Sequence, residues 1–271
     1  MNPQAQHSRF VGSIPAFYDR HLGPVIFEPH ARDLARRIAA GRSARVLETA
    51  CGTGMATRRI LELLPADAAY VATDLNPDML AHARTALAAD RRVDWRPADA
   101  QQLPFADGTF DAVTMQFGMM FVPDKERALR EAWRVLAPGG RFVFNVWDAF
   151  ARNPFGRITY EVGASLFPEN PPAFYKTPFG DHDPDAHTDR ARRAGFGAVT
   201  VEGVALEGVS ESAEHFAAGL IRGNPIALDI ESRGTVSCEE VEHHLAEALR
   251  RELGDRPVRT PLHAWVITAT R

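Results

Sequence analysis

The sequence predicts an α/β fold: a Rossmann-like, seven-stranded, mostly parallel sheet with its last strand antiparallel and helices on both faces. Strand and helix patterns alternate from Arg45 to Trp147, a glycine turn follows the first strand, and acids end the first three strands. Strands separated by helices at this spacing imply right-handed crossovers and parallel pairing. We also expect a lid insertion after the fifth strand.

The predicted elements follow from local patterns taken in chain order. A first helix is expected over 28–40, where four apolar residues recur at helical spacing and Gly41 ends the run. Strands are expected over the apolar or β-branched runs Arg45–Thr49, Ala69–Asp74, Val93–Arg96, Phe110–Met115 and Arg141–Trp147. The helices between them are expected over Gly54–Leu64, Pro77–Ala89 and Asp124–Leu136. Pro138-Gly139-Gly140 is expected to break the chain before the fifth strand.

The alternation is lost after Trp147. Residues 148–190 are rich in proline and aromatic residues and show no clean period, so we interpret them as an irregular insertion. The pattern then resumes weakly. Helices are expected over Thr188–Ala194, Glu211–Leu220 and Glu239–Leu253, and strands over Ala198–Ala205 and Ala264–Thr270.

Composition narrows the functional classes. The chain has 271 residues, of which 45% are hydrophobic and 24% charged, an ordinary globular composition. Its 31 basic residues are scattered among 35 acids, as on solvated helix faces, so we expect no nucleic-acid partner. Only Cys51 and Cys238 are cysteines, which predicts no disulfide framework and fits a reducing, cytoplasmic location. The polar start Met1–Gly12 and the interrupted apolar run 110–122 predict neither an export signal nor a membrane segment.

The segment Val46-Leu47-Glu48-Thr49-Ala50-Cys51-Gly52-Thr53-Gly54 is the most informative part of the sequence. It reads as a buried strand that runs into a glycine turn and opens a helix, so a ligand can approach bare backbone there. Gly52 and Gly54 resemble two glycines of a dinucleotide fingerprint. The third position, however, is Thr57, and the turn contains no lysine or arginine.

Three acids sharpen this interpretation. Glu48, Asp74 and Asp99 fall at the carboxyl ends of consecutive strands, where they would repel a pyrophosphate and attract a cationic, phosphate-free nucleotide. S-adenosylmethionine is such a ligand, with ribose hydroxyls that suit Asp74 and an adenine amino group that suits Asp99. Asp74 follows Gly54 by 20 residues, about the expected spacing for a ribose-binding acid. A single acid here could equally be a cap or turn former, but three in register favour a ligand site.

Four stretches resemble class I S-adenosylmethionine-dependent methyltransferases of the small-molecule type, the group that includes the ubiquinone and menaquinone C-methyltransferases (methyltransferase type 11). They are VLETACGTG, ATDLNPDML, RPADAQQLPFADGTFDAVTMQFGMMFVPD and LREAWRVLAPGGRFVFNVW. The resemblance covers about Arg45–Trp147 and implies S-adenosyl-L-methionine as cofactor. It implies cofactor binding by Tyr18, Glu48, Ala50, Gly52, Thr53, Gly54, Asp74, Leu75, Met79, Asp99, Ala100, Gln116 and Phe117. Ala50 departs from the family, which commonly has glycine there, so we expect a slightly altered turn.

We expect a single methyltransferase domain, 1–271, with four parts. Residues 1–40 are a cofactor-covering segment and first helix, 45–147 the cofactor-binding core, 148–190 the lid, and 191–271 the rest of the sheet with substrate-side helices.

Methyl transfer is an in-line displacement, for which the protein mainly supplies alignment and excludes water. A base is needed only if the acceptor loses a proton. The weak candidates are His21 and His30, with a surface or capping histidine as the alternative for each. Tyr175 and Phe179 either wall an apolar acceptor pocket or pack as core, and Arg222 is a candidate partner for an acidic substrate.

Asp181–Asp189 mixes carboxylates with imidazoles, but its spacing matches no metal cage and it precedes a helix whose dipole acids complement, so no metal is expected. The predicted function is methyl transfer to a small organic acceptor. The alternatives are a non-catalytic S-adenosylmethionine-binding regulator or partner protein and, disfavoured by the missing third glycine, an NAD-dependent oxidoreductase. The sequence leaves the acceptor atom, the pathway and the oligomeric state open.

Overall fold

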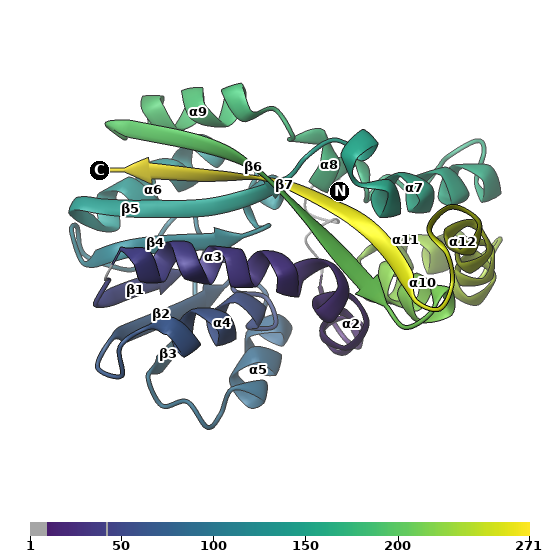
Figure 1. The fold of residues 1–271 in the computed structure, drawn as a ribbon, viewed down its shortest axis with the longest axis horizontal. Helices are drawn as coiled ribbons and strands as arrows, with labels where there is room; N and C mark the ends of the chain where they lie inside the picture. Colours follow the sequence, from purple (N-terminus) through teal and green to yellow (C-terminus); the bar gives the residue numbers. More distant parts are fainter. Residues whose placement is uncertain (1–9, 42) are drawn as a thin grey trace. The chain divides into compact units, whose positions relative to one another are not determined.

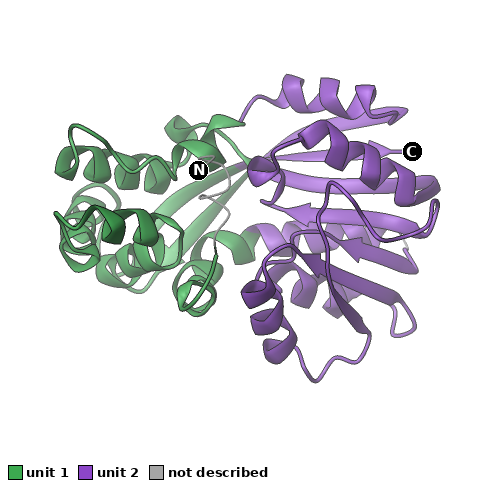
Figure 2. Cartoon of the chain, turned by 180° about the vertical axis from the view of Figure 1, so that it is seen from behind, with its two compact units in different colours: residues 1–29, 147–181, 205–263 green, residues 30–146, 182–204, 264–271 purple. Residues whose placement is uncertain are grey.

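A computed structural model describes residues 10–41 and 43–271 (Figure 1). Most of the polar start expected over Met1–Gly12 therefore lies outside the described residues. The chain divides into two compact units (Figure 2). Unit 1 comprises residues 1–29, 147–181 and 205–263, and unit 2 comprises residues 30–146, 182–204 and 264–271. The single domain, with its four parts, stays a prediction.

The described residues contain a seven-stranded sheet with strand order β3-β2-β1-β4-β5-β7-β6 (Figure 1). The strands are β1 (Arg45–Glu48), β2 (Ala69–Asp74), β3 (Val93–Pro97), β4 (Phe110–Gln116), β5 (Leu136–Trp147), β6 (Ala198–Ser210) and β7 (Val258–Thr270). The first five pair in parallel. β7 runs antiparallel to β5 and β6. The predicted mostly parallel Rossmann-like sheet is confirmed.

Strand β5 differs from its prediction at the amino end. Pro138-Gly139-Gly140 does not separate a helix from the strand, because pairing already begins at Leu136. The register between β4 and β5 shifts from Phe110↔Leu136 to Ala112↔Arg141, so the extra residues form an irregularity within the ladder. Gly139, with φ of 78°, takes a left-handed conformation that glycine adopts without strain.

The helices of the first half lie close to their predicted positions. They are α3 (Glu28–Ala40), α4 (Met55–Leu63), α5 (Pro77–Ala86) and α6 (Lys125–Val135), followed later by α9 (Pro184–Arg193). In α3 the fully buried side chains Ala31, Leu34, Ala35 and Ile38 form the apolar stripe from which the helix was predicted. α6 packs against α9 within unit 2.

The helices of unit 1 are α2 (Ile14–Phe17), the π-helix η1 (Tyr18–Phe27), α7 (Pro154–Leu166), α8 (Lys176–Gly180), α10 (Ala213–Arg222), α11 (Ile226–Arg233) and α12 (Cys238–Leu253). Of these, α10 and α12 lie close to the helices predicted over 211–220 and 239–253, whereas the others were not predicted. The 3₁₀ turns η2 (Met119–Phe121), in unit 2, and η3 (Phe150–Arg152), in unit 1, complete the description.

The irregular insertion expected over 148–190 is wrong as secondary structure, since much of it is helical. α7 buries Phe155, Ile158, Thr159 and Gly163, which follow helical spacing. Two of these four are not large apolar side chains, so the period was hidden in the sequence. Whether this segment acts as a lid stays a prediction. Among the described residues, no helix is long and apolar enough to cross a membrane.

Candidate cofactor site

The turn between β1 and α4 is built from alternating left-handed residues. Ala50, Gly52 and Gly54 have φ values of 52°, 56° and 84°. Glycine adopts this conformation without strain, whereas an alanine pays on the order of 1 kcal/mol. Ala50 thus keeps the left-handed backbone despite its methyl group. A Cβ built on Gly52 would meet no atom within 4 Å, which leaves open space over this part of the turn.

We expect Ala50→Gly to stabilise the protein by about 0.5–1 kcal/mol, because glycine removes the strain at this φ. The measurement is the midpoint of chemical denaturation. Ala81→Gly, in the exposed interior of α5, is the matched control and should instead destabilise by about 0.5–1 kcal/mol. Equal losses in both variants would show that Ala50 carries no strain.

Asp74, the last residue of β2, is fixed beneath this turn. Its Oδ2 accepts a hydrogen bond of 2.8 Å from the Gly52 N–H, and its Oδ1 accepts one of 2.8 Å from the Asn76 N–H. Its side chain is buried, and burial raises the pKa of its carboxyl, against the lowering effect of these backbone donors. The carboxylate therefore has a defined orientation at the carboxyl edge of the sheet, as a ribose-binding acid requires.

Glu48, at the end of β1, is held more deeply. Its Oε2 accepts hydrogen bonds from the Thr57 hydroxyl and, at 2.6 Å, from the Tyr70 hydroxyl. Burial raises the pKa of Glu48 to about 7, and the charge of Asp74 acts in the same direction, while the two hydroxyl donors lower it. The support of the site thus includes Tyr70, which no sequence pattern singled out, and Thr57, which the sequence marked only as the position of the missing third glycine.

The predicted adenine side of the site lies after β2 and β3. Asp99 accepts from the Gln101 backbone N–H at 2.8 Å and from the Gln101 side-chain amide at 3.1 and 3.2 Å. Leu75 is 60% exposed, an unusual position for a large apolar side chain and one that fits contact with a flat apolar ligand. Met79 is buried, and Ala100 is half-buried.

The turn also contains a buried hydroxyl and a buried thiol. Thr53 Oγ1 has no hydrogen-bond partner among the described residues and is inaccessible to solvent, so a ligand oxygen or nitrogen at the turn would satisfy it. Cys51 is buried, and burial raises the pKa of its thiol, with the charges of Asp74 and Glu48 acting in the same direction. A neutral buried thiol is a poor nucleophile.

The turn after β4 carries the Gln116-Phe117 pair. Phe117 has φ of 50°, an uncommon conformation for an aromatic residue, and its backbone N–H donates to Asn145 Oδ1 at 2.9 Å. Sequence reasoning missed Asn145. The signal was present, because a single amide stands in the otherwise apolar run FVFNVW.

The two candidate bases lie in different surroundings. His30 is fully buried in α3, and its ring meets the ring of Phe117 edge-on at 5.3 Å. His21, in η1, stacks on Phe17 and lies 4.3 Å, centroid to centroid, from His215. Burial lowers the pKa of His21, and the charge of His215 lowers it further. Neither set of contacts is specific to a general base, so the roles of His21 and His30 as bases stay predictions.

The other predicted residues of unit 1 are occupied by local packing. Tyr18 stacks on Phe27 with ring centroids 4.6 Å apart. The Tyr175 hydroxyl donates to the Leu220 carbonyl at 2.7 Å, and Tyr175 and Phe179 are both almost fully buried. Arg222 forms a close ion pair with Glu242. The roles of these residues toward the cofactor or the acceptor stay predictions. Within unit 1, the contacts of Tyr175 and Phe179 are those of core side chains, the second of the two alternatives given for them.

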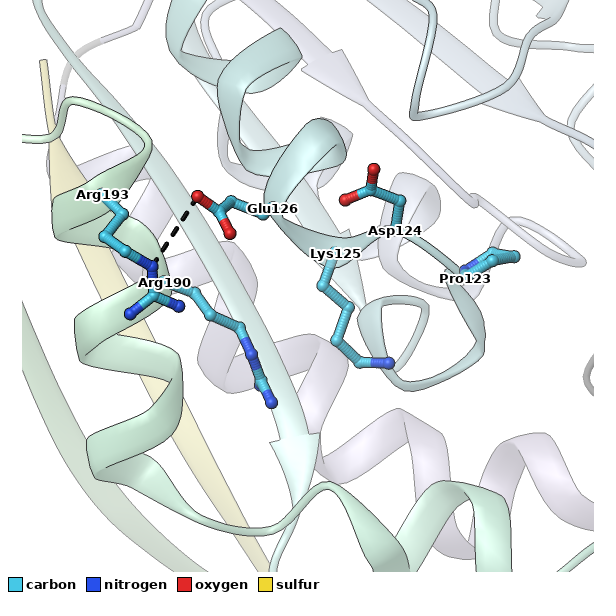
Figure 3. A pocket seen from close by; sticks show the side chains of 6 residues that line it. All are labelled: Pro123, Asp124, Lys125, Glu126, Arg190 and Arg193. Atoms are coloured by element: carbon cyan, nitrogen blue, oxygen red, sulfur yellow. Dashed lines mark ion pairs between the residues drawn. The ribbon is translucent and has the colours of Figure 1, made fainter.

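A cavity of about 340 Å³ opens on the surface of unit 2, and none of its lining residues is a predicted cofactor residue (Figure 3). It is lined by Pro123, Asp124, Lys125, Glu126, Arg190 and Arg193. Lys125 Nζ donates to the Val122 carbonyl at 3.1 Å, and Arg193 pairs with Glu126 at 3.7 Å. Two of its cations are therefore committed to protein partners. No group of three or more His, Cys, Asp or Glu arranged for a metal occurs within residues 10–41 and 43–271.

The segment from β1 to β5 is similar to known proteins. Residues 47–144, which run from β1 to β5 and carry all the unit 2 cofactor candidates, match the family model described as a methyltransferase domain. This segment is similar to a methyltransferase domain. A demethylmenaquinone methyltransferase of Thermus thermophilus is 44% identical over 119 residues, which are 44% of this chain and 53% of that protein. A ubiquinone/menaquinone biosynthesis C-methyltransferase of Methylobacterium nodulans is 44% identical over 112 residues, 40% of this chain and 44% of that protein.

The chain spans about half the length of the curated relatives it matches. The solved structure of an S-adenosylmethionine-dependent methyltransferase from Thermotoga maritima superposes with a TM-score of 0.55 at 20% identity, covering 98% of each chain. That likeness shows the fold, including the parts outside the family match.

Proposed function

We propose that this chain transfers a methyl group from S-adenosyl-L-methionine to a small organic acceptor. The proposal is supported above all by Asp74, a buried carboxylate oriented by two backbone donors directly under a glycine turn. The open space at Gly52, the exposed Leu75 and the unpartnered Thr53 hydroxyl fit a nucleoside ligand at the same strand ends. The names of the related methyltransferases are consistent with a small-molecule acceptor.

The sulfonium of the bound cofactor would supply an already activated methyl group. The side chains of this protein would then position the cofactor and supply negative charge near its cationic part. Asp74 would hold the ribose, Asp99 and Leu75 the adenine, and the ionised Glu48 would attract the positive charges of the methionine part. Because alignment carries the chemistry, no dedicated base is required unless the acceptor must lose a proton.

We also propose a cytoplasmic location and a reaction that involves no nucleic acid. The free cysteines Cys51 and Cys238 fit a reducing compartment. The described surface arginines are largely engaged in ion pairs with acids, as Arg37 is with Asp33 and Glu202, rather than forming an unpaired basic stripe.

Calorimetric titration tests the proposal. We expect S-adenosylmethionine and S-adenosylhomocysteine to bind with micromolar dissociation constants, on the order of −8 kcal/mol. NADH, followed by its fluorescence, is the control ligand and should not bind, because the acids repel its pyrophosphate. A panel of small acceptors then tests transfer. Binding of NADH without binding of either sulfur nucleoside would overturn the proposal, and cofactor binding without transfer to any acceptor would favour the non-catalytic alternative.

A further inference from the structure

Two strained turns meet at the cofactor site of unit 2. The turn after β1 contains Ala50 and the turn after β4 contains Phe117, both left-handed residues other than glycine. A Cβ added at Gly118 would lie 2.7 Å from the Ala50 Cβ and 2.8 Å from Met115 Cγ, so the two turns are in direct contact. A change in the backbone at Phe117 would therefore displace the glycine turn as well.

Asn145 is the residue that holds the second turn. It lies on β5 opposite Gln116 in the parallel register and is 1% exposed. Its Oδ1 accepts the Phe117 N–H at 2.9 Å. Its Nδ2 has no hydrogen-bond partner among the described residues, so the amide acts on the protein through its oxygen. A strained backbone persists only where its surroundings over-determine it, and such residues cluster at ligand sites.

We propose that Asn145 is a positioning residue of the cofactor site, whose amide oxygen fixes the left-handed turn at Phe117 and so presents the Gln116-Phe117 backbone to the ammonium group of an amino-acid-bearing nucleoside. This inference rests on the proposed function. His30 packs against the Phe117 ring and restrains the side chain, whereas Asn145 restrains the backbone that would face the ligand.

Two substitutions at Asn145 distinguish the contribution of the amide oxygen from that of the rest of the side chain. Asn145→Leu keeps the approximate volume and removes the acceptor, so the turn loses its restraint. Asn145→Asp keeps an oxygen acceptor for the Phe117 N–H and replaces the Nδ2 donor, which has no partner to lose in the described residues, by a second, acidic oxygen. We expect Asn145→Leu to raise the dissociation constant for S-adenosylhomocysteine about 10- to 30-fold and Asn145→Asp to change it less than about threefold.

Asn153→Leu is the control for general destabilisation. Asn153 is fully buried in unit 1, where it donates to the Asp148 and His263 carbonyls and accepts from the His263 N–H. Its loss should lower the melting temperature at least as much as Asn145→Leu while leaving the affinity within twofold. All titrations are made at one temperature, below the melting temperature of the least stable variant.

The outcomes are separable. If the wild type binds S-adenosylhomocysteine and folded Asn145→Leu binds it equally well, Asn145 is only structural and this inference is wrong. The same conclusion follows if Asn145→Asp loses affinity as severely as Asn145→Leu, since the oxygen would then not be responsible. If the wild type binds no S-adenosylhomocysteine, the proposed function fails and the inference fails with it.

Discussion

Glu48→Gln is expected to stabilise the protein above pH 7 by up to about 3 kcal/mol and to have little effect at pH 4.5. Burial raises the pKa of Glu48 from 4.5 to about 7, so keeping it ionised in the folded state costs about 3 kcal/mol. Below pH 4.5 the carboxyl is protonated in both states and no cost arises. Between pH 4.5 and 7 the unfolded chain ionises first, so the stability of the wild type falls as the pH rises.

The glutamine amide oxygen can still accept the hydroxyls of Thr57 and Tyr70, so the substitution retains both hydrogen bonds while removing the buried charge. The measurement is the free energy of unfolding by urea at pH 5, 6, 7 and 8. This free energy should fall with rising pH in the wild type and should not fall in the variant. Glu62→Gln is the control, because Glu62 is half exposed and pairs with Arg59 at the surface. A variant with the same pH dependence as the wild type would show that Glu48 is not the titrating group.

This gain in stability should be accompanied by weaker cofactor binding. If the ionised Glu48 attracts the cationic methionine part, Glu48→Gln should bind S-adenosylmethionine roughly tenfold more weakly at pH 8, about 1.4 kcal/mol. At pH 5, where the wild-type carboxyl is protonated, the two proteins should bind alike. A buried charge that is kept for ligand binding commonly lowers the stability of the unliganded protein in this way.

Asp74→Ala is expected to weaken S-adenosylhomocysteine binding at least about 100-fold. The carboxylate would accept hydrogen bonds from the ribose, and such bonds to a charged group contribute about 1.5–3 kcal/mol each. The substitution also removes the acceptor for the Gly52 and Asn76 N–H groups, so the glycine turn loses its lower support. We expect an additional loss of stability of about 2 kcal/mol, measured by urea unfolding.

Asp74→Asn, which retains one carbonyl oxygen, should fall between the wild type and Asp74→Ala in affinity. Asp94→Ala on neighbouring β3 is the matched control, since Asp94 is half exposed and forms a surface ion pair with Arg96. It should leave affinity unchanged. Retention of affinity within threefold by folded Asp74→Ala would contradict the placement of the ribose at this carboxylate.

The alternating half of the chain was predictable because its signals are local. Buried parallel strands read as short apolar runs, and their helices carry an apolar stripe, as α3 does with Leu34 and Ile38. The glycine turn and Asp74 have fixed sequence spacing, so their association followed from topology alone. The helical nature of 148–190 did not follow, because α7 packs through Thr159 and Gly163, whose burial depends on neighbours distant in sequence.

By itself the sequence determined the parallel strands of the cofactor half, the glycine turn and the acids at the strand ends, because parallel strands bring their carboxyl ends to one edge. Only the tertiary structure decided what each acid does. Burial raises the pKa of Glu48 while the 2.6 Å hydrogen bond from Tyr70 orients its carboxyl and opposes that shift, and the 2.9 Å hydrogen bond from the Phe117 N–H makes Asn145 the support of a strained backbone. Both join residues more than 20 positions apart, and such contacts are set by packing in three dimensions, which no local pattern records.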